Sequence, residues 1–141
     1  MKYFEFGQEH SELMVMLHGG GVSYLGMLPT AQKLAERYHV VLVAYDGFNP
    51  SEPETEFVSP MDEARRLGDY VVEHYGGKID ILYGISYGCR VLMEVLADKR
   101  LTVTTTIADG MGLRDYPNIK SKWGKDVYCF FFTGLFYAVM G

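Results

Sequence analysis

Three short apolar runs, the third of them interrupted by Asp80, constrain the fold of this chain more than any other feature. They cover residues 13–17, 40–45 and 79–84, and a glycine-rich or acidic turn follows each of them. An unbroken run of this length is typical of a strand that is buried on both faces, as the strands of a parallel sheet are. The runs therefore predict the central strands of a parallel sheet.

Helices are predicted between these strands. Apolar residues recur there at helical spacing, and Ser59 followed by Pro60 is typical of a helix start. The predicted helices lie within residues 25–38, 59–75 and 87–99. Two further strands are predicted, an alternating one over 2–7 and a β-branched core strand near 101–108. This order predicts an α/β fold, a three-layer sandwich with a mostly parallel central sheet, in which ligands bind beyond the carboxyl ends of the strands.

Composition and charge disfavour several classes of protein. A chain of 141 residues suits one domain, and its net charge of −5, with 13 scattered Lys and Arg side chains, argues against nucleic acid as a partner. The N-terminal segment lacks the apolar run of a secretory signal, and the longest uncharged run, 127–140, is too short for a membrane span. Cys89 and Cys129 are expected to be reduced apolar fillers in a cytoplasmic protein.

A Gly-x-Ser-x-Gly pattern, made by Gly84, Ser86 and Gly88, lies where the third apolar run meets a predicted helix. A serine in such a tight strand-to-helix turn is raised above the sheet, and the helix N-terminus favours negative charge that develops beside it. The flanking glycines remove side-chain clashes from the turn. The pattern alone is weak evidence, but this context favours a nucleophilic Ser86 over a plain glycine-rich turn.

The second motif is His18 followed by Gly19, Gly20 and Gly21, at the end of the first apolar run. Acyl transfer needs two hydrogen-bond donors where the carbonyl oxygen becomes an oxyanion. We expect Gly20, and next Gly21, to supply one backbone N–H, and Tyr87 to supply the other. The alternative is a phosphate-binding or merely tight turn, but no lysine follows the glycines, so the motif is not a P-loop.

In this order and spacing, the segments resemble the N-terminal half of an α/β-hydrolase of the esterase and serine-peptidase-like kind. The matching segments are MLHGGGVS, VVLVAYDGFNPSE, IDILYGISYGCRVLMEVL and TTTIADG. The resemblance implies a hydrolase core over residues 1–113 and the helical, apolar start of a cap over 114–141. It also implies a serine hydrolase for a small, uncharged ester, thioester or amide, with no cofactor and no metal. Asp46 and Gly47 would have a structural or pocket-edge role.

The catalytic histidine of the family has no counterpart after Ser86. The family order is serine, acid and then histidine. All four histidines of this chain precede the serine: His10, His18, His39 and His74. His18 is a weak candidate for the base, since its ring in this motif more often holds the loop. Asp109 is a candidate acid, although a turn residue before Gly110 is the preferred interpretation.

We therefore expect a chain that is truncated after the strand near 101–108 and is the front part of a longer ancestral product. Its activity should be very low, because a serine hydroxyl is a poor nucleophile without a base. The alternatives are a non-catalytic remnant that binds a ligand or partner, and a degenerate fragment whose apolar C-terminus serves only assembly. An unpaired sheet edge at 101–107, or the apolar C-terminus, predicts self-association.

Overall fold

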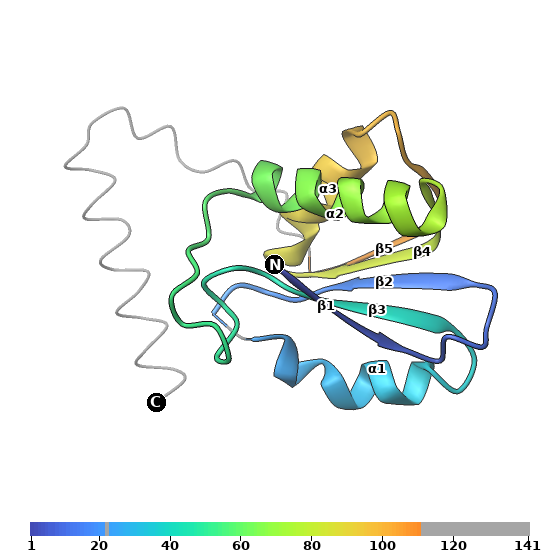
Figure 1. The fold of residues 1–141 in the computed structure, drawn as a ribbon, viewed down its shortest axis with the longest axis horizontal. Helices are drawn as coiled ribbons and strands as arrows, with labels where there is room; N and C mark the ends of the chain where they lie inside the picture. The colour runs from blue at the N-terminus through green and yellow to red at the C-terminus, as the bar shows by residue number, and fades with distance from the viewer. Residues whose placement is uncertain (22, 111–141) are drawn as a thin grey trace. The chain divides into compact units, whose positions relative to one another are not determined.

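The computed structural model describes residues 1–21 and 23–110, and these form a five-stranded sheet with helices on both faces (Figure 1). The strands are β1 Lys2–Phe6, β2 Leu13–Leu17, β3 His39–Ala44, β4 Lys78–Ile85 and β5 Thr102–Asp109. The helices are the 3₁₀ helix η1 Tyr24–Gly26 and the α-helices α1 Leu28–Leu34, α2 Pro60–Tyr75 and α3 Gly88–Ala97. The predicted elements of this part of the chain are confirmed, with their ends shifted by a few residues. The predicted cap, 114–141, lies outside the described residues.

The strand order is β1-β3-β2-β4-β5. β2 pairs in parallel with both β3 and β4, and β4 pairs in parallel with β5. β1 differs, because it lies antiparallel to β3, with Lys2 opposite Ala44 and Phe6 opposite Val40. Since the four parallel strands run the same way, their carboxyl ends lie together, and the residues that follow them meet there.

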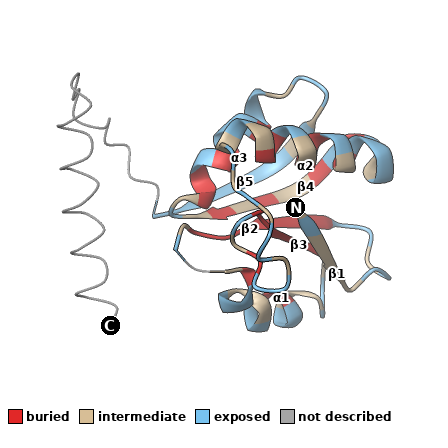
Figure 2. Ribbon diagram, turned by 60° about the vertical axis from the view of Figure 1, so that its left-hand side comes forward, coloured by how far each residue is buried: buried red, intermediate tan, exposed pale blue. Residues whose placement is uncertain are grey.

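Two buried layers hold the helices against the sheet (Figure 2). On one face, Val15 of β2 belongs to the same cluster as Leu67 of α2 and Leu92 of α3. On the other face, Met14 of β2 clusters with Ala31 of α1. Successive side chains of a strand point to opposite faces, and every residue of β2 is buried. The unbroken apolar run therefore predicted correctly a strand that is covered on both sides.

The prediction of a core strand near 101–108 was wrong in one respect. β5 forms at that place, but its residues are exposed except for the half-buried Val103. β-branched residues favour the extended, pleated backbone, and this preference does not require burial. Within the described ranges, β5 is the last strand on its side of the sheet, so the predicted exposed edge lies here.

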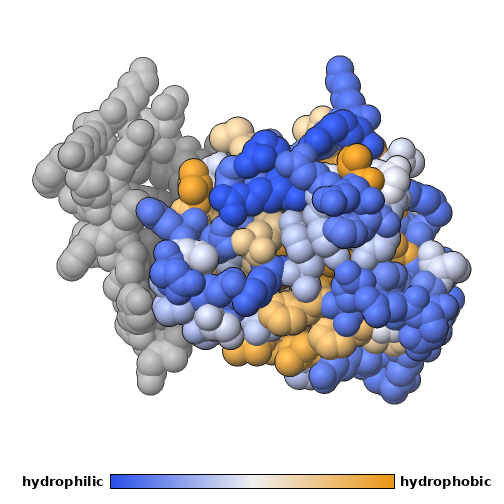
Figure 3. Space-filling model, in the orientation of Figure 1, coloured by the Kyte–Doolittle hydropathy of each residue, from blue (hydrophilic) through white to orange (hydrophobic). Residues whose placement is uncertain are grey.

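On the face shown in Figure 3, the described core is mostly hydrophilic, with groups of hydrophobic side chains among the polar ones. The exposed large hydrophobic residues come from η1, the loop before α2, α2 itself, α3 and β5. They are Leu25, Val58, Met61, Val72, Met93, Leu96 and Ile107. No helix among the described residues is long and apolar enough to cross a membrane.

Helix α2 begins and ends at the residues that its sequence predicts. The Ser59 hydroxyl accepts a hydrogen bond from the Asp62 N–H at 3.1 Å, and Pro60 occupies the first turn. Gly76 ends the helix with φ of 62°, a conformation that glycine adopts without steric cost. Local capping chemistry therefore defines this helix before any tertiary contact is considered.

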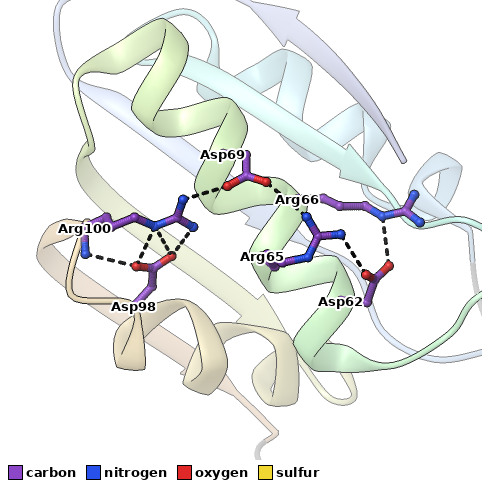
Figure 4. A network of polar contacts seen from close by, with 6 residues as sticks. All are labelled: Asp62, Arg65, Arg66, Asp69, Asp98 and Arg100. Atoms are coloured by element: carbon purple, nitrogen blue, oxygen red, sulfur yellow. Dashed lines mark hydrogen bonds and ion pairs between the residues drawn. The ribbon is translucent and has the colours of Figure 1, made fainter.

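A network of ion pairs joins α2 to the turn between α3 and β5 (Figure 4). Arg100 in that turn lies 2.7 Å from Asp69 of α2 and 2.7 Å from Asp98. Along α2, further pairs join Asp62 to Arg65 and Arg66, and Arg65 to Asp69. The side chains are partly exposed, so the network fixes geometry more than it adds stability.

Candidate active site

Ser86 occupies a strained turn between β4 and α3. Its φ is 50°, and it is the one residue other than glycine with a positive φ in the described part of the chain. A side chain in this left-handed region costs about 1–2 kcal/mol. The Ser86 N–H donates to the Asp109 carbonyl oxygen at 2.7 Å, and the residue is exposed. The backbone therefore holds the serine hydroxyl out at the carboxyl end of β4.

The glycines of the motif allow close approach of the backbone. A Cβ on Gly88 would lie 2.4 Å from the Leu17 carbonyl oxygen and 2.6 Å from that of His18. A Cβ on Gly84 would lie 3.1 Å from the Gly88 backbone. Only a residue without a side chain lets the start of α3 lie directly against the end of β2.

The glycine-rich loop after β2 lies beside the residue that follows Ser86. A Cβ on Gly20 would be 3.1 Å from the Cβ of Tyr87, and Gly21 has φ of 76°. The structure therefore brings together the two backbone segments that the sequence predicts as an oxyanion hole.

His18 is fully buried and holds the loop in place. Its Nδ1 lies 2.8 Å from the Gly19 carbonyl oxygen, and the Tyr45 N–H donates to its Nε2 at 3.3 Å. These partners imply that Nδ1 carries the proton and donates it to Gly19. The ring also packs on Tyr45, with 4.1 Å between the centroids. Both nitrogens make backbone contacts, which supports a structural role for His18 over that of general base.

The other three histidines lie away from Ser86. His10 precedes β2, His39 begins β3, and His74 lies near the end of α2, just before β4. All three positions belong to the amino ends of parallel strands, whereas Ser86 follows the carboxyl end of β4. His39 is instead paired with Glu5, with 2.8 Å between its Nε2 and the carboxylate. Of the four histidines, His18 is therefore the one on the Ser86 side of the sheet.

Asp109 is brought beside Ser86 by strand register, since Ile85 and Asp109 are partners across β4 and β5. Its carboxylate accepts a hydrogen bond from the Tyr83 hydroxyl at 3.0 Å. Burial, together with this hydrogen bond, raises the pKa of Tyr83. The backbone contact with Ser86 gives Asp109 a structural function in the turn, whether or not its carboxylate takes part in chemistry.

Aromatic side chains link the loop after β3 to this site. Gly47 adopts φ of 74°, and its N–H donates to Thr55 at 3.0 Å, so the loop folds back on itself. Phe57 then packs edge-on against Tyr87, with centroids 5.8 Å apart, and against Phe48 at 5.5 Å. Phe57 was not predicted from the sequence, because a single aromatic residue in a polar loop has no periodic signal.

Glu63 was also missed. It lies in the first turn of α2, where an acidic residue is ordinary, yet its side chain is fully buried. Neither carboxylate oxygen has a hydrogen-bond partner among the described residues. Burial, and next the nearby Asp46, raises the pKa of Glu63 to about 7. The sequence did contain a sign of this burial. Glu63 precedes Leu67 and Val71 at intervals of four residues, so it lies on the same buried face of the helix.

Cys89 lies in the same turn as Ser86 and is buried, as predicted for an apolar filler. Its thiol donates to the Gly84 carbonyl oxygen at 3.1 Å, and burial raises the pKa of the thiol. In the described ranges, no group of three or more His, Cys, Asp and Glu side chains is placed to hold a metal ion. Cys129 lies outside those ranges.

A parallel sheet that carries a serine in a left-handed strand-to-helix turn, next to a glycine-rich loop, has the architecture of an α/β-hydrolase core. The chain belongs to the alpha/beta hydrolase family, since the sequence model of that family matches residues 14–137. The predicted resemblance is therefore confirmed. A search of curated proteins found no match.

Solved structures agree with this fold. A putative alpha/beta hydrolase family protein from Desulfitobacterium hafniense superposes with a TM-score of 0.71 at 24% identity, over 78% of this chain and 44% of that one. A thermophilic esterase from Thermogutta terrifontis superposes with a TM-score of 0.66 at 20% identity, over 82% of this chain and 42% of the esterase. An epoxide hydrolase from Aspergillus niger superposes with a TM-score of 0.61 at 18% identity, over 82% of this chain and 33% of the epoxide hydrolase. The chain thus spans less than half the length of these proteins, and at such identities the likeness concerns the fold.

Proposed function

We propose that this chain provides the nucleophile and oxyanion hole of a serine hydrolase that acts on a small, uncharged ester, thioester or amide. The observation that carries the proposal is the left-handed turn at Ser86, with Gly20 packed against Tyr87. A residue with a side chain adopts such a backbone only where the surrounding structure requires it. The turn costs stability and exposes one hydroxyl, which is the pattern expected of a nucleophile.

In this proposal the Ser86 hydroxyl oxygen attacks the substrate carbonyl carbon. The carbonyl oxygen becomes an oxyanion and is bound by the N–H groups of Tyr87 and Gly20, with Gly21 as the next candidate. Helix α3 begins at Gly88, so its positive N-terminal end lies beside the developing charge. One oxyanion-hole donor contributes about 10²–10³-fold to the rate of acyl transfer.

Turnover by this chain should be very low. A base must take the Ser86 proton, and three of the four histidines lie at the amino ends of the parallel strands, whereas Ser86 follows a carboxyl end. The fourth, His18, has both ring nitrogens on backbone groups. Without a histidine, roughly 10³–10⁴-fold catalysis over water is typical of what the oxyanion hole and binding retain. Asp109 has the position of a candidate acid but no imidazole to orient.

A second candidate function is binding without catalysis. The same histidine positions favour it, because a site with an oxyanion hole and no base can hold a carbonyl group without cleaving it. The two candidates differ in whether Ser86 forms a covalent bond.

The experiment is labelling with a fluorophosphonate probe, with intact-protein mass as the readout. Ser86→Ala should abolish labelling, and Ser51→Ala, at an exposed loop position, should not change it. Imidazole added to the buffer should accelerate labelling at Ser86, since it supplies the base that the turn lacks. Labelling that persists in Ser86→Ala would refute the proposal. No labelling of the folded wild type, with or without imidazole, would favour binding alone.

A further inference from the structure

A cluster of aromatic side chains extends from the core to the candidate site. Tyr45 is buried directly after β3, whereas Phe48, Phe57 and Tyr87 are half-buried. The ring of Phe57 contacts the other three rings, with centroids 6.1 Å from Tyr45, 5.5 Å from Phe48 and 5.8 Å from Tyr87. All three contacts are edge-to-face, a geometry that packed aromatic rings prefer. Phe57 thus lies at the centre of the cluster, and part of its surface stays accessible.

The loop that carries Phe57 is folded by contacts of its own. The Gly47 N–H donates to the Thr55 hydroxyl at 3.0 Å, and that hydroxyl donates to the Glu52 carbonyl oxygen at 2.9 Å. A Cβ on Gly47 would lie 2.8 Å from the Phe57 nitrogen and 3.3 Å from the Phe57 Cβ. Because Gly47 and Thr55 position the backbone of Phe57, replacement of the ring should leave the course of the loop unchanged.

Tyr87 links these rings to the proposed oxyanion hole. It follows Ser86 directly, and a Cβ on Gly20 would lie 3.1 Å from the Cβ and 3.3 Å from the Cγ of Tyr87. In the proposed function, the N–H groups of Gly20 and Tyr87 bind the carbonyl oxygen of the substrate. A substrate bound there is therefore within reach of the aromatic cluster.

The charge of the same loop disfavours an anionic substrate group. Residues 46–58 include no lysine or arginine and four carboxylates, those of Asp46, Glu52, Glu54 and Glu56. Asp46 and Glu52 take part in ion pairs, and Glu54 and Glu56 are exposed. An anionic group beside this loop would be repelled and would find no cation within it. Apolar rings with acidic neighbours therefore favour an apolar group without negative charge.

We propose that Phe57 is a specificity-determining residue: its ring, with those of Phe48 and Tyr87, packs against an apolar ring that the substrate carries close to the reacting carbonyl. This inference rests on the proposed function, which places that carbonyl at Ser86. It adds a substrate class, that of neutral esters, thioesters or amides with an aryl or arylalkyl group. A pair of aromatic rings contributes up to about tenfold in affinity beyond the area that it buries.

The test uses two fluorophosphonate probes that differ in the carbon group on phosphorus, which is phenylethyl in one and methyl in the other. In both, the Ser86 oxygen displaces fluoride from phosphorus, and its proton passes to imidazole added to the buffer. The readout is the ratio of the two labelling rates, because a general change in the reactivity of Ser86 affects both rates alike. Phe57→Ala should lower the preference for the phenylethyl probe by about tenfold.

Val58→Ala is the matched control, because Val58 is the next residue of the loop and is 69% exposed. It should keep the wild-type ratio. If Phe57→Ala does not fold, Phe57→Leu, which keeps an apolar side chain without the ring, should still lower the ratio. A ratio that is the same in the wild type and in the folded Phe57 variants would overturn the inference.

A binding measurement separates this inference from the proposed function. Nuclear magnetic resonance at the Gly20 and Tyr87 amides compares the affinities of phenylacetamide and acetamide, which require no reaction at Ser86. A phenyl preference that is lost in Phe57→Ala, without labelling of Ser86 in any variant, would support the inference and refute only the proposed hydrolase. If Ser86 is not labelled and the wild type binds phenylacetamide no better than Phe57→Ala does, the inference and the proposed hydrolase both fail.

Discussion

The stability of this protein should depend on pH through Glu63, and substitution of that residue by glutamine should remove the dependence. The carboxyl has a pKa of about 7 in the folded chain, because it is buried and lies near Asp46, against an ordinary glutamate pKa of 4.5. Below about pH 4.5, both the folded and the unfolded chain hold the proton. Between about pH 4.5 and 7 the unfolded chain has released it and the folded chain has not, so the unfolded state is favoured as pH rises.

The magnitude follows from the two values. Their difference, 7 − 4.5 = 2.5 pH units, multiplied by about 1.4 kcal/mol per unit, gives a loss of up to about 3.5 kcal/mol in the free energy of unfolding. The loss should be almost complete by about pH 8. For a domain with a typical stability of about 5–15 kcal/mol, this is a large fraction.

The assay is urea denaturation followed by circular dichroism at about pH 5, 6, 7 and 8, on wild type, Glu63→Gln and Glu73→Gln. Relative to wild type, Glu63→Gln should gain stability as pH rises, with the steepest change below pH 7. Glu73→Gln should run parallel to wild type throughout. A constant difference between wild type and Glu63→Gln across this range would refute the reasoning, since it would mean that Glu63 ionises alike in the folded and unfolded chains.

Three further predictions concern packing, ion pairs and the sheet edge. Gly88→Ala should cost about 3 kcal/mol, because its Cβ would lie 2.4 Å from the Leu17 carbonyl oxygen. Gly26→Ala, where nothing lies within 4 Å, should leave the denaturation midpoint nearly unchanged, and equal effects would contradict this packing argument. Arg100→Ala should lower the melting temperature only in low salt, because its ion pairs are partly exposed; a loss that persists in high salt would count against this. Self-association through the exposed β5 edge should be reduced in light scattering by Thr105→Lys, and a wild type that is monomeric at micromolar concentration would exclude it.

Much of the fold could be predicted from local sequence because each element carries its own signal. The unbroken run at 13–17 predicted a strand buried on both faces, and β2 is that strand. Ser59 and Pro60 predicted the start of α2, and Gly76 its end. The Gly-x-Ser-x-Gly pattern predicted a strand-to-helix junction at Ser86, where the backbone is left-handed.

The candidate site was only partly predictable. Gly20 and Tyr87 were named as partners from a motif, and the structure places them in contact range. Phe57 and Glu63 were missed, since a loop aromatic and a first-turn acid are common and their burial depends on distant segments. The burial of β5 was misjudged for the same reason, because a β-branched strand has the same local pattern at the centre and at the edge of a sheet.

The sequence by itself determined the order of strands and helices, the ends of α2 and the identity of the serine turn. These depend on periodicity, capping and backbone conformation, which neighbouring residues define. Only the tertiary structure decided that β1 runs antiparallel at one edge, that His10, His39 and His74 lie at the amino ends of the parallel strands, away from Ser86, and that Glu63 is buried. Strand pairing and burial arise from contacts between residues far apart in the chain, and no local pattern specifies which distant partner they meet.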